Sequence, residues 1–490
     1  MRKFLLASIF ILSTILSTVA VFADSSGYDE EETPAIPIQG TAAILVEQST
    51  GRVLFGYNHL ERRYPASMTK MLTALVVLDH LELDDIIVVG PEIHNMPAGY
   101  ASLSLVEGEH ITVRMLLKSL MIRSGNETGR VLALNVIRRT TGNAHISYDD
   151  AKREFSVLLN QRAHELGAEN TNFNNPYGLH SPHHFTTAYD MALIARAYME
   201  VPVLAEIAGM RTFEGTGTEG QYITDALIRD YDWTNTNRLL PDAEFGHPNI
   251  TGIKTGFTTP AGECFAGAAT FGDMSYITIV FDSAGQGRWQ DTIRLMNYGF
   301  LNYSFRDVAR ADEFVEYVRI VNPRRGGADV LAVYSTASHT ALLSNAEYDS
   351  LTRVITYNVL LRAPAVRGGE GDEYDEYYDY DLTRLQAPIE EGEIIGRVAY
   401  YIGDERVFEG NLIAAAAVYE RTFDSDMDYF ISIFTDNIFT LRGLPYWLAI
   451  GGTIIGFVGM GWALSLRRKL KEHDRWHRPR SRNGGPSPRR

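Results

Sequence analysis

The stretch Pro65-Ala66-Ser67-Met68-Thr69-Lys70 decides the fold, because it places a lysine one helical turn after a serine. Apolar residues follow at positions 68, 71, 72, 75 and 76, which is the spacing of an amphipathic helix with a proline just ahead of it. Ser67 and Lys70 then lie on one face of that helix. A serine hydroxyl needs a base before it can act as a nucleophile, and a lysine kept neutral by burial can supply one. The stretch therefore predicts an activated serine near a helix N-terminus, where backbone amides favour developing negative charge.

A second motif, Ser124-Gly125-Asn126, follows an expected helix over 114–121. It offers a hydroxyl and a side-chain amide. We expect Ser124 to relay a proton to a leaving amine and Asn126 to hold an amide group of the substrate. Either motif alone occurs by chance in many chains. Their order, and their positions at the boundaries of expected elements, make the combination specific.

A third motif, Lys254-Thr255-Gly256, begins a strand-rich part of the chain. Its lysine brings a second ammonium group to the site, and repulsion between two such groups favours the neutral form of each. Thr255 can hydrogen-bond a substrate carboxylate, while Gly256 belongs to an expected edge strand that pairs with an extended peptide. The backbone amides of Ser67 and of a residue on that strand, Phe257, are suited to form an oxyanion hole.

The pattern of helices and strands predicts a mixed α/β domain over residues 40–303. We expect strands over 42–45, 53–55, 264–269 and 276–281, and helices over 114–121, 149–166, 187–199 and 288–300, with Thr186 or Thr187 as the cap of the third. Residues 311–422 contain alternating short apolar runs without a long helical pattern, and this predicts a small all-β, sandwich-like domain. Residues 368–380 within it are acidic and rich in tyrosine. We interpret them as a solvated insertion, with cation binding as the alternative.

The two ends of the chain predict export and membrane attachment. Residues 1–23 carry two basic residues, an apolar run and small residues before Asp24, which is typical of a signal peptide, and residues 24–39 are expected to form a flexible stalk. Residues 444–466 contain no charge and are long enough to span a bilayer. The tail over 467–490 carries ten basic residues against two acidic ones, so we expect it in the cytoplasm and everything before the helix outside.

Charge and composition exclude several other classes of function. The 490-residue chain has a formal net charge of -16; without the basic tail and the two basic residues of the first 23 positions, the exterior part carries -26. Such a surface does not bind nucleic acid by charge. Cys264 is the single cysteine, so no disulfide forms within the chain, and its apolar neighbours favour a buried side chain over a nucleophile. His180, His183 and His184 cluster in one segment, which we interpret as a polar loop rather than a metal site, and no cofactor is expected.

With the three motifs in place, the chain resembles the low-molecular-mass penicillin-binding proteins that act as D-alanyl-D-alanine carboxypeptidases. The resemblance covers residues 40–303 most strongly. It implies an antiparallel sheet flanked by helices, as in β-lactamases and DD-peptidases, followed by a small all-β domain. Many relatives attach to the membrane by an amphipathic helix, whereas this chain is expected to span it with one C-terminal helix.

The resemblance also implies roles for individual residues. Ser67, Lys70 and Ser124 would be catalytic, and the substrate-binding set would be Asn126, Lys254, Thr255, Gly256 and Arg288. Arg288 matches the family arginine that faces the substrate carboxylate; a plain surface charge on a helix is the alternative. The chain departs from the family pattern at Glu127-Thr128-Gly129 and at residues 175–180, where relatives often carry His-Gly-Leu-Asp.

Three functions compete. The first is a serine carboxypeptidase that removes the terminal D-alanine of the peptidoglycan pentapeptide through an acyl-enzyme and is covalently inhibited by β-lactam antibiotics. The second is a β-lactamase, for which the expected Glu-x-x-x-Asn pattern does not occur between residues 127 and 250. The third is a non-catalytic protein that binds the cell wall. We also expect contact with membrane lipid through residues 444–466.

Overall fold

The computed structural model describes residues 35–94, 96, 105–358, 384–438 and 444–476. The expected signal peptide, most of the expected stalk, the acidic insertion and the last part of the basic tail therefore lie outside the described residues. The chain divides into two compact units: one comprises residues 1–305 with 342–345, and the other comprises residues 306–341 with 346–490.

The first unit is built around a five-stranded antiparallel sheet in the order β2-β1-β9-β8-β7. Its strands are β1 (Ala42–Glu47), β2 (Val53–Tyr57), β7 (Ile250–Thr258), β8 (Gly262–Phe271) and β9 (Met274–Ser283). The N-terminal hairpin is thus paired with strands from more than 200 residues later in the chain. The order leaves β7, which carries the Lys-Thr-Gly motif, at one edge of the sheet, as expected.

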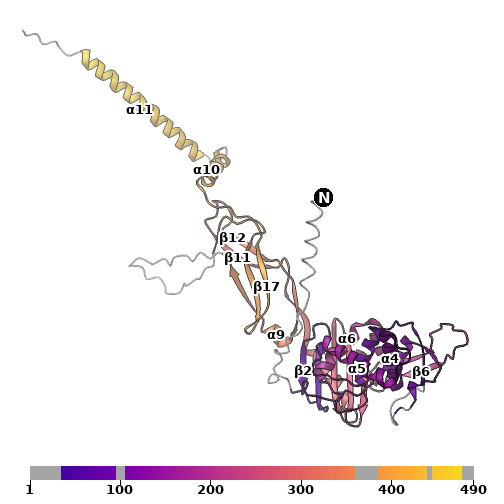
Figure 1. Ribbon diagram of the computed structural model, residues 1–490. Coiled ribbons are helices and arrows are strands. Elements are labelled where there is room, and N and C mark those ends of the chain that lie inside the picture. The colour runs from indigo at the N-terminus through magenta and orange to yellow at the C-terminus, as the bar shows by residue number, and fades with distance from the viewer. Residues whose placement is uncertain (1–34, 95, 97–104, 359–383, 439–443, 477–490) are drawn as a thin grey trace, which may run out of the picture. The chain divides into compact units, whose positions relative to one another are not determined.

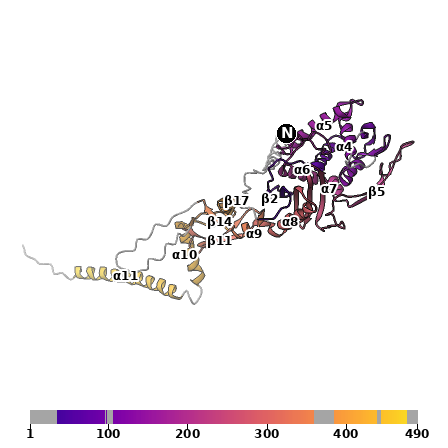
Figure 2. The same ribbon diagram turned by 90° about the horizontal axis from the view of Figure 1, so that it is seen from below.

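The sheet forms a layer between two groups of helices (Figure 1). All six residues of β1 are buried, and they alternate between two cores. Ala42, Ile44 and Val46 belong to the core shared with the larger helical group, whereas Ala43 and Leu45 belong to a core that includes Leu295 of α8 (Gly287–Asn302). Figure 2 shows α8 on the other side of the sheet from α4, α5 and α6.

The larger helical group carries the first two motifs and is built from η3 (Ala66–Thr69), α2 (Lys70–Leu78), α3 (Val113–Lys118), η5 (Ser119–Arg123), α4 (Asn126–Thr141), α5 (Tyr148–Glu165), α6 (Ala188–Glu200) and α7 (Pro202–Gly209). The Thr187 side chain caps α6 by accepting from the backbone of Asp190, which settles the choice between Thr186 and Thr187. Smaller elements are β3 (Ile86–Val88), η4 (Pro91–Ile93), β4 (His110–Thr112), β5 (Thr212–Thr216) and β6 (Asp230–Thr234).

Two local features differ from the sequence-based expectation. Ser67 lies in a 3-10 turn and not in an α-helix, because the α-helical hydrogen bonding begins only at Lys70. The residue before it, Ala66, has φ of +47°, a left-handed value that L-residues adopt only when the surroundings impose it. The helix α4 was not expected at all, although it starts within the Ser-Gly-Asn motif.

The second unit contains the expected all-β domain. Its sheet has six strands in the order β14-β16-β17-β12-β11-β15. They are β11 (Phe314–Val321), β12 (Val330–Ser335), β14 (Thr352–Tyr357), β15 (Arg384–Gln386), β16 (Ile394–Ile402) and β17 (Glu405–Ala414), and only the pair β11–β15 is parallel. The strands β10 (Tyr303–Ala309) and β13 (His339–Ser344) form a two-stranded sheet, and the division between the units falls within both. The short helix α9 spans Asn345–Asp349.

Two helices follow the sheet of the second unit: α10 (Phe423–Ile438) and α11 (Leu444–Trp476). Residues 447–471 of α11 are long and apolar enough to cross a membrane. Large apolar side chains such as Ile455, Phe457 and Trp462 are more than two-thirds exposed on this helix. No such exposure is stable in water along a whole helix, so the segment is compatible with a membrane anchor.

Candidate active site

The first two motifs meet at the amino group of Lys70. Its Nζ lies 2.8 Å from Ser67 Oγ and 3.2 Å from Ser124 Oγ. It also donates to the backbone oxygen of Ser124 at 2.9 Å and to Oδ1 of Asn126 at 2.6 Å. Four residues from two distant motifs are thus joined through one nitrogen atom.

This arrangement suits a neutral amine. Neutral lysine has two N–H groups and one lone pair. The two carbonyl oxygens, one from the Ser124 backbone and one from the Asn126 side chain, can accept both N–H groups. The lone pair is then left for the hydroxyl proton of Ser67, so the same contacts that hold Lys70 in place direct its basic site at the serine.

The surroundings also favour the neutral form. Lys70 is completely buried, and this burial lowers its pKa well below the ordinary value; the positive charge of Lys254 lowers the pKa further, while Glu127 opposes the shift. Lys254 is itself completely buried, and burial together with the charge of Arg288 lowers its pKa to about 7. Repulsion between the two lysines is therefore part of the cause, as the sequence suggested, but desolvation is the larger part.

Ser124 reaches Lys70 because of an unusual backbone. The π-helical turn η5 ends at Ser124, whose φ of +62° is left-handed. That conformation turns both its carbonyl oxygen and its hydroxyl toward Lys70, and α4 begins two residues later with Asn126. The junction between η5 and α4 thus places the side chains of Ser124, the C-cap of η5, and of Asn126 on the same amine.

The Lys-Thr-Gly strand lies against the turn that carries Ser67. A Cβ atom added to Gly256 would stand 2.9 Å from the backbone oxygen of Pro65, so only glycine permits this approach. Lys254 Nζ donates to the backbone oxygen of Thr255 at 3.0 Å, and the Thr255 hydroxyl is 2.8 Å from that of Thr236. On the other side of Gly256, the side chain of Phe257 is 59% exposed.

Arg288 is not a plain surface charge. From α8 it donates to the backbone oxygens of Gly256 and Cys264, each at 3.2 Å, and forms an ion pair with Glu263. Its guanidinium stacks on Trp289, 4.4 Å from the ring centre. The arginine therefore ties β7 to β8 behind the motif. Cys264 is buried beside it, and burial raises the pKa of the thiol to about 12, so the cysteine is no nucleophile.

A loop over residues 174–181 supports the serine turn from outside the motifs. Gly178 has φ of +86°, and a Cβ atom there would lie 2.9 Å from the Ser67 nitrogen and closer still to the carbonyl of Ala66. The Thr73 hydroxyl donates to the backbone oxygen of Pro176 at 2.6 Å. This loop is thus in direct contact with the backbone that positions the nucleophile.

His184 anchors the same region from within. Its Nε2 lies 2.9 Å from the hydroxyl of Thr69, which donates to the backbone oxygen of Ala66 at 2.9 Å. Its other nitrogen accepts from the backbone of Asn174, and the ring stacks on Phe173. Burial, with a smaller contribution from His180, lowers the pKa of His184 to about 3. His184 thus supports the turn. Among the described residues no group of three or more His, Cys, Asp or Glu side chains is placed to hold a metal.

Comparison with known proteins agrees with this geometry. Residues 29–285 match the family model described as D-alanyl-D-alanine carboxypeptidase, and residues 362–420 match the C-terminal domain of penicillin-binding protein 5. The carboxypeptidase DacF of Bacillus subtilis is 30% identical over 318 residues, which is 63% of this chain and 76% of that protein. DacD of Escherichia coli is 27% identical over 85% of this chain and 97% of its own length.

Among solved structures, penicillin-binding protein 5 from Haemophilus influenzae matches with a TM-score of 0.52 and 23% identity, over 79% of this chain and all of that one, and this shows a common fold. The family model alone covers more than half of the chain. The chain belongs to the D-alanyl-D-alanine carboxypeptidase family.

Proposed function

We propose that this protein is a serine-type D-Ala-D-Ala carboxypeptidase that removes the terminal D-alanine from peptidoglycan stem peptides. The observation that carries the proposal is the buried amine of Lys70, 2.8 Å from Ser67 Oγ and held by two carbonyl oxygens. Membership of the carboxypeptidase family supplies the substrate class.

In the acylation step, Ser67 Oγ attacks the carbonyl carbon of the penultimate D-alanine while its proton passes to Lys70 Nζ. The negative charge that develops on the carbonyl oxygen is received by the backbone amides of Ser67 and Phe257. The carbon–nitrogen bond then breaks. The proton returns from Lys70 through the hydroxyl of Ser124, which is 3.2 Å away, to the leaving nitrogen of D-alanine.

In the deacylation step, water attacks the ester of Ser67 and gives up a proton to the same amine. The bond between the carbonyl carbon and Ser67 Oγ breaks, and the serine recovers its proton. A β-lactam ring takes the place of the scissile amide in the first step and leaves a covalent adduct on Ser67.

The remaining candidates bind the substrate. Asn126 holds a substrate amide, Thr255 donates a hydrogen bond to the terminal carboxylate, and Gly256 lets β7 pair with the extended peptide. Lys254 and Arg288 add positive charge for that carboxylate. Because Arg288 donates to the backbone oxygen of Gly256, it also keeps the binding strand in place.

The decisive experiment measures D-alanine released from diacetyl-L-Lys-D-Ala-D-Ala by the purified ectodomain. We expect release by the wild type and none by Ser67→Ala. A labelled penicillin should form a lasting adduct on the wild type only. Rapid turnover of the penicillin without a lasting adduct would favour the β-lactamase alternative. If the wild type formed no adduct and released no D-alanine, only the non-catalytic, wall-binding alternative would remain.

We further propose that α11 crosses the membrane and leaves the catalytic unit on the extracytoplasmic face. The apolar segment and the basic residues that begin at Arg467 support this orientation. Since Cys264 is buried, new cysteines can report topology. On intact cells, an impermeant maleimide should label Tyr222→Cys, which is 88% exposed, and leave Ser487→Cys unlabelled; the reverse pattern would contradict the orientation.

A further inference from the structure

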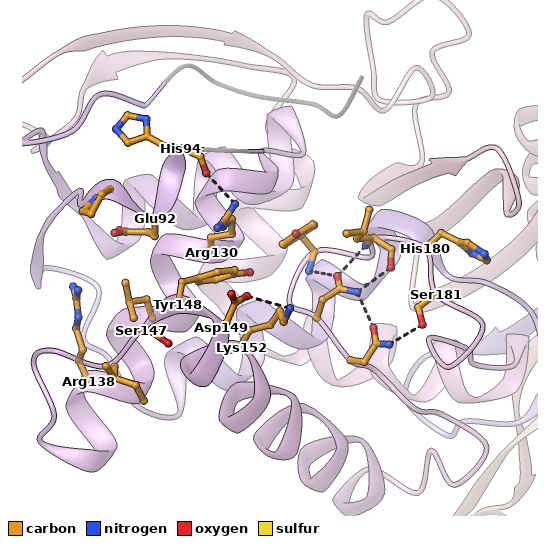
Figure 3. A pocket seen from close by; sticks show the side chains of 17 residues that line it. Glu92, His94, Arg130, Arg138, Ser147, Tyr148, Asp149, Lys152, His180 and Ser181 are labelled. Atoms are coloured by element: carbon orange, nitrogen blue, oxygen red, sulfur yellow. Dashed lines mark hydrogen bonds and ion pairs between the residues drawn. The ribbon is translucent and has the colours of Figure 1, made fainter. Parts of the chain in front are cut away.

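A cavity of about 690 Å³ lies in the first unit, and none of the residues assigned above to catalysis or substrate binding lines it. Its walls come from η4, from α4, from the start of α5 and from the loop over residues 174–181 (Figure 3). Polar and charged side chains dominate the lining, so a purely apolar ligand does not suit it.

Five lining side chains carry a buried nitrogen or oxygen that has no hydrogen-bond partner among the described residues. The atoms are Glu92 Oε2, Arg130 Nε, Arg138 Nε, Tyr148 Oη and His180 Nδ1. Glu92 is only 6% exposed, and its other oxygen accepts from the backbone of Gly90. Buried polar atoms are nearly always paired, because leaving them unpaired costs stability. Their gathering around one cavity indicates a ligand that supplies the missing partners.

The helix α4 begins at the catalytic centre with Asn126 and continues along the cavity. Asn126, which accepts from Lys70, is followed at intervals of four residues by Arg130, Leu134 and Arg138, and these last three line the cavity. Residues four apart are neighbours on a helix surface. At a rise of 1.5 Å per residue, Arg130 lies about 6 Å and Arg138 about 18 Å along the axis from Asn126.

The loop that forms the opposite wall is the one that supports Ser67. Asn175 and Tyr177 line the cavity, while their neighbour Gly178 packs against the backbone of Ala66 and Ser67. Asn175 fixes this part of the loop, since its side chain accepts from the backbone amides of Gly178 and Leu179 at 2.9 Å each. The cavity and the nucleophile therefore share one wall.

The lining defines the chemistry of the ligand. Arg130 and Arg138, whose backbone positions are about 12 Å apart along α4, offer guanidinium donors to carboxylate groups. The guanidinium group of Arg130 is fixed in position, since it lies 4.0 Å from the ring centre of Tyr148 and donates to the backbone oxygen of His94 (Figure 3). Glu92 offers an acceptor to an N–H group. An extended peptide advances about 3.3 Å per residue, so a carboxylate-bearing peptide matches both the spacing and the charge.

We propose that this cavity binds the upstream, carboxylate-bearing part of the peptide whose terminal D-alanine is removed at Ser67. The inference rests on the proposed carboxypeptidase function and adds a second point of recognition to it. A carboxylate about two residues upstream of the scissile bond lies near Arg130, and groups beyond it extend toward Arg138. Short substrates that end before this point leave the cavity empty.

The test compares two substrates on the full-length protein in detergent. One is diacetyl-L-Lys-D-Ala-D-Ala; the other is a pentapeptide in which L-alanine and a γ-linked D-glutamate precede the same three residues. We expect Arg130→Gln and Glu92→Gln each to raise KM for the pentapeptide roughly tenfold, as expected for loss of one charge-assisted hydrogen bond. Turnover of the short substrate should change less than twofold.

Arg139→Gln is the matched control, because Arg139 neighbours the same row on α4 but forms an ion pair with Asp85 and does not line the cavity. This substitution should change the KM of neither substrate. The rate of penicillin acylation reports whether each variant is folded. Equal losses on both substrates in a folded variant, or no loss on the pentapeptide, would overturn the inference. A wild type that releases D-alanine from neither peptide would instead contradict the proposed function.

Discussion

Replacing Gly178 by alanine should disable the nucleophile without changing any catalytic side chain. The new Cβ atom would lie 2.9 Å from the Ser67 nitrogen and closer still to the carbonyl of Ala66, whereas carbon atoms need about 3.5 Å from a non-bonded neighbour. The turn and the loop must therefore separate by more than about 1 Å, and a misplacement of about 1 Å already costs about 100-fold in rate. The left-handed φ of +86° adds a backbone cost of about 1–2 kcal/mol for alanine.

Gly142 provides the matched control. It ends α4 with φ of +69°, and a Cβ atom there meets nothing within 4 Å. Gly142→Ala should thus lose about 1–2 kcal/mol of unfolding free energy through its backbone alone. Gly178→Ala should lose about 1–3 kcal/mol more through overpacking. Urea unfolding measures both, and stopped-flow acylation by a labelled penicillin measures the rate. If Gly178→Ala were acylated as fast as Gly142→Ala, the loop would not position Ser67.

Three further predictions concern titration. Lys254→Met removes a positive charge near Lys70, so the pKa of Lys70 should rise and the acid limb of the pH profile for penicillin acylation should move to higher pH. The pKa of Lys254 is about 7 in the folded protein and about 10.5 in the unfolded chain, so the unfolded chain binds more protons between pH 7 and pH 10.5. Stability measured in urea should therefore rise with pH over this range, and more steeply in the wild type than in Lys254→Met. The pKa of His184 is lowered from 6.5 to about 3, so stability should fall as pH drops from 6.5 toward 3, and His184→Gln should lose less over that range than the wild type.

The sequence was sufficient to predict the elements whose pattern is strong. The hairpin of β1 and β2 and the helices α5, α6 and α8 follow from apolar spacing and turn residues, and the edge position of β7 follows from the role expected of its Lys-Thr-Gly motif. Local patterns carry no information about pairing between distant strands. The interior position of β1, between β2 and β9, therefore could not be predicted from them.

The helix α4 was missed for a physical reason. Its buried side chains include Asn126, Glu127 and Thr128, so its first turn is polar although it faces the interior. A search for an apolar stripe does not detect such a turn. Asn126 accepts from Lys70, and the charge of Glu127 opposes the lowering of that lysine's pKa by burial. Thr128 is hydrogen-bonded to Ser119. The first turn of α4 is therefore buried through polar contacts, which an apolar pattern does not reveal.

The same reasoning applies to the site as a whole. Its motifs could be recognised because Ser67, Lys70 and Lys254 have chemical roles that few other residue types can fill. The supporting contacts could not be recognised from the sequence. Gly178 is required because two backbone segments approach closely there, and His184 is required because it pairs with one buried hydroxyl. Neither requirement leaves a periodic pattern.

The two buried lysines show why the support matters. Burying either amine disfavours its charged form, and each amine is further destabilised by a neighbouring cation. The contacts that desolvate Lys70 also orient its amino group. The carbonyl oxygens of Ser124 and Asn126 accept its N–H groups, and Ser67 lies at its lone pair. Loosening the turn would admit water and let Lys70 regain its proton. Precision of position and basicity are thus one property of this site, and any substitution that moves Ser67 away from Lys70 should weaken both together.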